Sequence, residues 1–98
     1  MAYDAQTALA MMKATALSLM KTRLNRLPED TSQDEYLSAC LEGTVGELAK
    51  NGIVLTQSAA DTMLLVDAAV WKYQNRDKAA GMPEWLRLRR RERWIGGP

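Results

Sequence analysis

A chain of 98 residues is long enough to enclose one hydrophobic core and too short for a second. Hydrophobic residues make up 47% and charged residues 26%, which excludes an intrinsically disordered protein. The formal net charge of +1 excludes a polycation, so any contact with nucleic acid must depend on a local cluster of charge. We expect a single domain over residues 1–98.

The first predicted helix covers residues 4–27, with Asp4 as its cap. Its apolar residues recur at spacings of three and four, which is the helical period. They are Leu9, Met12, Ala16, Met20, Leu24 and Leu27. Pro28 ends this helix, because the residue before a proline is pushed out of the helical region. Thr15 can restart a helix after a break, so the segment can be one helix or two.

The second predicted helix covers residues 32–51. The stretch Ser32–Glu35 is typical of a capping box, in which the serine and the glutamate satisfy the first amides. The apolar face consists of Tyr36, Leu37, Cys40, Leu41, Val45 and Leu48. Gly52 supplies a left-handed residue that closes the helix. Gly43 and Gly46 each cost about 1 kcal/mol inside a helix, which favours a close backbone approach or a bend there.

The third predicted helix covers residues 56–80, is capped by Thr56 or Ser58, and is the long central element. From Met63 to Trp71 it is apolar except for Asp67. A helix that is apolar on nearly all sides must be covered on more than one side. We therefore expect this helix to have more apolar surface than the monomer hides, and to contact other copies or partners.

Asp67 is a candidate interface residue, because a charge among apolar residues needs a partner. One interpretation is structural: an exposed stripe shared with Gln74, or a salt bridge to a lysine or arginine of the same chain. The other interpretation is a bond to a neighbouring subunit.

The fourth predicted helix covers residues 83–95, and Pro83 occupies its first position. It belongs to a basic C-terminal segment, residues 84–98. Tryptophan and arginine are enriched at interface hot spots, so we predict a partner-binding segment here. Its candidate residues are Trp85, Arg87, Arg89, Arg90, Arg91, Arg93, Trp94 and Ile95. A solvated helix, an acidic protein partner and nucleic acid all remain open. Successive arginines on a helix point in different directions and form no single reading face.

Residues for catalysis or metal binding are scarce. Histidine is absent, and Cys40 stands alone on an apolar helix face, which indicates a buried, inert thiol and no disulfide. The acidic loop from Asp30 lacks the glycine and the glutamate of a calcium loop, since Glu35 and Leu41 occupy those positions. No apolar run approaches the roughly 20 residues that span a bilayer. We expect a soluble, intracellular protein that is not an enzyme, with no catalytic, cofactor or metal site.

Three segments together resemble the small helical head–tail connector (adaptor) proteins of tailed bacteriophages. Residues 63–77 join an apolar helix to an aromatic residue, a tyrosine and an Asn-Arg-acid step. Residues 81–87 supply a Met-Pro turn, and residues 24–37 supply a helix end, an acidic loop and a second helix. The likeness covers about residues 15–95. Two features depart from the family pattern: residues 1–14, an N-terminal extension, and the dense arginines after Leu88.

This resemblance implies a structural virion protein of a phage or prophage, assembled in the host bacterial cytoplasm. Such proteins form a ring below the portal and join it to the tail-completion (stopper) protein, while DNA passes through the channel without sequence-specific contact. The implied partners are therefore further copies of the chain, the portal and the stopper, and the chain can be a monomer in solution. The fold expectation is all-α, a small bundle of four helices. The alternative is a small helical nucleic-acid-binding regulator that uses the C-terminal arginines.

Overall fold

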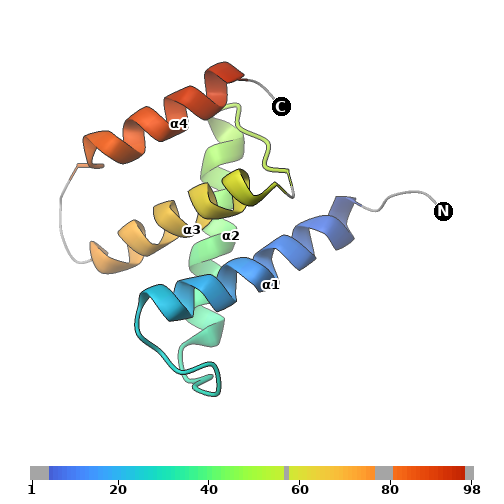
Figure 1. Cartoon of the computed structure of the whole chain (residues 1–98), viewed down its shortest axis with the longest axis vertical. Coiled ribbons are helices and arrows are strands. Elements are labelled where there is room, and N and C mark those ends of the chain that lie inside the picture. The colour runs from blue at the N-terminus through green and yellow to red at the C-terminus, as the bar shows by residue number, and fades with distance from the viewer. Residues whose placement is uncertain (1–4, 57, 77–80, 97–98) are drawn as a thin grey trace.

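Four helices make up the computed structural model, which describes residues 5–56, 58–76 and 81–96. They are α1 (Ala5–Arg23), α2 (Asp34–Lys50), α3 (Ala59–Gln74) and α4 (Glu84–Gly96) (Figure 1). The described residues contain no strand, and the predicted all-α bundle is confirmed. Over the same residues, no helix is both long enough and apolar enough to pass through a bilayer.

The third helix is central, as predicted, and it packs against all three of the others. α1 and α2 enclose one side of it, while α4 lies along another side and packs closely only on α3 (Figure 1). The main core joins α1, α2 and α3 through Met12, Ala16, Met20, Leu37, Leu41, Leu65, Val66, Ala69 and Val70. A smaller cluster joins α4 to α3 through Leu86, Leu64 and Ala68.

α3 does not carry the excess apolar surface that its sequence suggests. From Asp61 to Val70 every residue is buried except Met63, which is 39% exposed. The prediction of an incompletely covered central helix is therefore wrong, because three helices of the same chain surround it. The exposed apolar side chains lie instead on α1, on α4 and in the connections, as Met11, Leu27, Val54, Trp85, Leu88 and Ile95 show.

α1 is one helix and ends earlier than predicted. Asn25 adopts a left-handed φ of 58°, and the amide of Arg26 donates to the carbonyl of Lys21 at 2.8 Å. This arrangement closes a helix before Pro28 can act, because asparagine tolerates the left-handed region. As a result Leu27 lies outside the helix and is 69% exposed, not part of the apolar stripe. Met12 lies in the main core, so the part of the predicted N-terminal extension from Ala5 onward is helical and belongs to α1.

The predicted capping box is wrong. α2 begins after Gln33, which makes no side-chain capping bond, and the hydroxyl and amide of Ser32 both donate to Asp30 Oδ1. Ser32 thus closes a local turn and is not available to the helix. At the other end Gly52, with φ 84°, takes the predicted left-handed conformation, and the amide of Ile53 bonds to the carbonyl of Leu48.

The glycines inside α2 mark neither a close approach nor a contact within the chain. A Cβ built on Gly43 or Gly46 meets nothing within 4 Å, and both residues are exposed. The expected close backbone approach is therefore absent from this monomer. Cys40 also differs slightly from expectation, since it is half-buried at the edge of the core.

Between the two predicted caps of the third helix, the structure selects Ser58. Its hydroxyl accepts from the amide of Asp61 at 3.1 Å. α3 ends at Gln74, with Asn75 as its cap, and so is shorter than the predicted 56–80. α4 begins one residue after Pro83. Asp4, the side chain of Leu9 and residues 77–80, on which other predictions fall, lie outside the described residues.

Candidate protein interface

The side chains of α4 divide into three faces, because consecutive residues on a helix are turned by about 100°. The inner face packs on α3 and carries Leu86 with Arg89, Arg90 and Arg93, which lie three, four and seven positions beyond it. The outer face carries Trp85, Leu88, Glu92 and Ile95. The third face carries Arg87, Arg91 and Trp94.

On the inner face, Arg89 and an arginine of α1 hold the same buried carboxylate. Arg89 Nη1 pairs with Asp67 Oδ2, and Arg23 Nη1 pairs with Asp67 Oδ1. Asp67 is buried near the middle of α3, where an unpaired charge would be costly. The predicted intrachain salt bridge is confirmed. Both oxygens of Asp67 are therefore engaged within the chain, which removes this residue from the candidate interface.

Arg93 is fixed in the same way by Asp61. Its Nε donates to Asp61 Oδ1 at 2.7 Å and its Nη2 to Oδ2 at 3.1 Å, so two parallel bonds hold one carboxylate. The amide and the hydroxyl of Thr56 donate to Oδ2 at 2.8 and 2.9 Å. Burial raises the pKa of Asp61, but the bonds from Arg93 and Thr56 outweigh it, and the pKa lies below its ordinary value.

Glu47 of α2 joins two other helices. Lys72 Nζ donates to Glu47 Oε2 at 2.8 Å, and Arg90 Nη1 lies 3.7 Å from Oε1. The hydrogen bond from Lys72 lowers the pKa of Glu47 against a smaller opposing effect of burial. Three of the five predicted interface arginines therefore bind acids of their own chain, and we assign Arg89, Arg90 and Arg93 to holding α4 in place.

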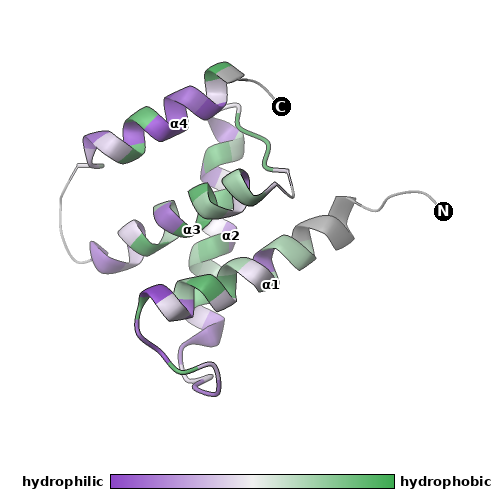
Figure 2. Cartoon of the chain, in the orientation of Figure 1, coloured by the Kyte–Doolittle hydropathy of each residue, from purple (hydrophilic) through white to green (hydrophobic). Residues whose placement is uncertain are grey.

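The outer face of α4 is an exposed apolar stripe, here called the α4 stripe. It consists of Trp85, Leu88 and Ile95, whose exposed fractions lie between 48% and 66%, with Glu92 among them. Figure 2 shows that α4 is mostly hydrophilic, with a few hydrophobic positions along it. Spacings of three and seven place them along one line, as in helices that pack against a partner. Nothing in the described chain covers them.

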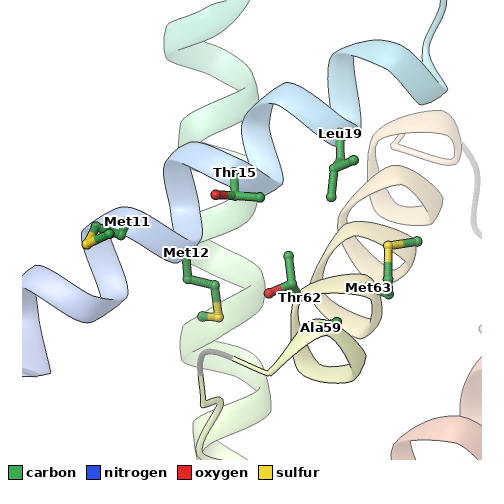
Figure 3. Close-up of a pocket in the computed structure, with 7 residues that line it drawn as sticks. All are labelled: Met11, Met12, Thr15, Leu19, Ala59, Thr62 and Met63. Carbon is green, nitrogen blue, oxygen red and sulfur yellow. The ribbon is translucent and has the colours of Figure 1, made fainter.

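A second exposed apolar surface lies between α1 and α3, here called the α1–α3 groove. It encloses about 400 Å³ and is lined by Met11, Met12, Thr15, Leu19, Ala59, Thr62 and Met63. Figure 3 shows the side chains of α1 and α3 facing this space from its two sides. The sequence analysis missed this surface. Its signal was the methionine content, since flexible methionines suit adaptable binding surfaces.

The third face of α4 borders a hollow of about 270 Å³, here called the basic hollow. Its lining residues are Asn51, Ile53, Arg87, Arg90, Arg91 and Trp94. A Cβ on Gly52 would lie 2.8 Å from Trp94 Nε1, so the absence of a side chain lets the indole approach the end of α2. Among the described residues no group of three potential metal ligands occurs.

Comparisons with known proteins give no relative for this chain. No protein-family model, no curated protein and no solved structure matches it. The function must therefore be argued from the surfaces described above.

Proposed function

We propose that this protein is a structural subunit that joins copies of itself head to tail, as the head–tail connector of a tailed phage or prophage. The observation that carries the proposal is the presence of two unlike apolar surfaces, the α4 stripe and the α1–α3 groove, which share no residue. Together they suit a repeated contact in which the stripe of one copy enters the groove of the next.

Such a contact has a definite geometric consequence. A two-fold dimer uses the same patch on both subunits, whereas a contact between unlike patches repeats around a ring or along a filament. The chain measures 37 × 34 × 19 Å, so each subunit is a flat slab. A ring of such slabs around a channel is what the resemblance to connectors implies, with the portal above it, the stopper below it and DNA passing through.

Two of the segments that carry the resemblance belong to α3 and α4. Residues 63–76 form most of α3 and its end, and residues 81–87 form the turn and first residues of α4. α4 also carries the exposed tryptophans, Trp85 and Trp94. We accordingly propose virion localisation, a portal and a stopper as partners, and a role without catalysis.

The test is assembly on portal rings of the same phage or prophage, observed by electron microscopy. We expect Leu88→Lys in the α4 stripe and Met63→Lys in the groove each to abolish the added ring, because each places a charge in an apolar contact. Val54→Lys is the control, since Val54 is an exposed apolar residue outside both surfaces. Helical circular dichroism should be unchanged in all three variants. Rings of normal occupancy with both surface variants would contradict the proposal.

Point substitutions test the proposed contact more specifically than deletion of the C-terminal segment does. Removing residues 85–98 would also remove Leu86, which is fully buried against Leu64 and Ala68. It would further leave Asp61 and Asp67 without arginines that now pair with them. A loss of assembly after that deletion would therefore not distinguish a lost contact from a disturbed fold.

The nucleic-acid regulator has less support than the sequence suggests. Of the five arginines after Trp85, three are held by Glu47, Asp61 and Asp67. A protein that neutralises Z phosphates shows a salt slope of about −0.9Z. Two remaining arginines would give a slope of only about −2, so a gel shift that weakens much more steeply with salt would favour the regulator.

A further inference from the structure

Two arginines of α4 are distinguished from the other three by having no partner. Arg89, Arg90 and Arg93 are paired with acids, whereas Arg87 and Arg91 have neither a hydrogen bond nor an ion pair among the described residues. Both are exposed, and they lie one helical turn apart on the same face. The two guanidinium groups thus lie one turn apart on α4, and their positive charge is not balanced by an ion pair among the described residues.

The surroundings of these two arginines form a shallow, open recess. Both line the basic hollow, together with Trp94 one turn further along α4. The floor includes Ile53, which is buried. Arg90 contributes a third guanidinium, and Glu47, its acid partner at 3.7 Å, does not line the hollow. The hollow therefore combines positive charge with an apolar floor and an aromatic wall.

Among the described residues, no acidic side chain lines this recess. Lys50, the last residue of α2, adds a positive charge directly before Asn51 and has no ion pair among the described residues. The C-terminal end of α2 supplies only about half a negative charge. Its last carbonyls are also engaged by the amides of Gly52 and Ile53. The recess is therefore complementary to an anion.

We propose that the basic hollow binds a carboxylate-bearing segment of a partner protein, with Arg87 and Arg91 gripping the carboxylates. Arginine forms bidentate bonds with carboxylates, and the indole Nε1 of Trp94 can donate a further bond. The exposed indole of Trp94 favours a protein segment over a nucleic-acid backbone, since it offers contact area for apolar side chains. The inference rests on the proposed function only in taking this segment to belong to another component of the same assembly.

The hollow can be tested on the intact isolated chain by nuclear magnetic resonance. The probe is an acetylated hexaglutamate peptide, and the readout is the indole amide signal of Trp94, assigned with Trp94→Phe. We expect the peptide to shift this signal, while a hexaglutamine peptide leaves it in place. We expect Arg87→Gln with Arg91→Gln to weaken peptide binding at least about tenfold, which corresponds to about 1.4 kcal/mol.

A matched double variant controls for loss of net charge. Lys13→Gln with Arg76→Gln also removes two positive charges, far from the hollow, and should leave peptide affinity within about twofold. Both residues lie outside the lining of the hollow, Lys13 paired with Glu42 and Arg76 stacked over Tyr73. Equal weakening in the two double variants would overturn the proposal. So would a 12-base-pair DNA duplex that binds the hollow more tightly than the peptide.

The outcome also separates this inference from the connector proposal. Peptide binding that depends on Arg87 and Arg91, with no assembly on portal rings, would support the hollow and contradict the connector. Ring assembly that needs Leu88 and Met63, with no peptide binding, would support the connector and contradict the hollow.

Discussion

Single residues in α2 and α3 affect the stability of the fold in opposite ways. Gly43 and Gly46 lie within a helix, are exposed and have open space around their Cα atoms. Asp61 lies at the opposite extreme, with a buried carboxylate that Arg93 and Thr56 hold together. These positions respond to substitution in opposite directions.

Alanine at Gly43 and Gly46 should stabilise the monomer. Each change is expected to raise the free energy of unfolding by about 0.5–1 kcal/mol, because alanine loses less backbone entropy in a helix and meets no neighbour. Urea unfolding followed by circular dichroism measures the gain. Gly52→Ala is the contrasting control, because a φ of 84° and the indole of Trp94 both oppose a side chain there. A loss of stability at Gly43 or Gly46 would mean that another surface packs against them.

The contribution of Asp61 should depend on pH in the acid range. Its pKa is lower in the folded protein than the ordinary value of 3.8, so the unfolded chain takes up the proton first as the pH falls. Stability from this group is therefore complete well above pH 3.8 and declines as the pH falls below it. Urea unfolding between pH 3 and pH 7 should show a stability difference between the natural chain and Asp61→Asn that shrinks below about pH 4. A difference that is constant over this range would contradict the assignment.

At the scale of the element, α4 is the helix with the weakest apolar attachment. It packs closely only on α3, and Leu86 is its one fully buried residue. Leu86→Ala should weaken the packing of α4 on α3 by about 2–4 kcal/mol. Because α4 has few other apolar contacts, this loss exceeds the stabilisation that its ion pairs supply. Hydrogen exchange should then accelerate in α4 and remain slow in the core of α1–α3. Leu88→Ala, one helical face away, is the control and should leave exchange unchanged.

Some features of the helices could be predicted from the sequence and others could not. The number and order of the helices, the central place of α3, a cap at Thr56 or Ser58 and the left-handed Gly52 all follow from local patterns. The end of α1 does not, because Asn25 competes with Pro28 and acts first. Local patterns rank such signals poorly, since both residues end helices.

Which arginines of α4 pair with acids could not be predicted from the sequence, because the sequence does not show which face of α4 packs on α3. If Leu86 faces α3, then positions three, four and seven further on share its face, and Arg89, Arg90 and Arg93 become partners for acids. Leu88 is equally apolar, and if Leu88 faced α3, Arg91 and Ile95 would point inward instead. Only the packing of α4 on α3 decides between the two leucines.

At the scale of the whole molecule, the exposed apolar surface lies at the periphery and not at the centre. Most of α3 is enclosed, while the α4 stripe is open on α4 and the α1–α3 groove is open beside the first turns of α3. The apolar run in the sequence therefore marks the core, and the interface proposed above lies on other surfaces. A methionine-rich first helix and an amphipathic last helix were the weaker signals, and the structure gives them the surfaces on which the proposed assembly depends.

Asp67 gives the molecule a mechanical linkage between its first and last helices. Arg23 of α1 and Arg89 of α4 hold opposite oxygens of one carboxylate, although the backbones of α1 and α4 do not approach closely. A displacement of α4 is therefore transmitted to α1 through this carboxylate, in addition to the packing of both helices on α3. Asp67→Asn would remove both ion pairs, leave both helices in place and let each move without the other.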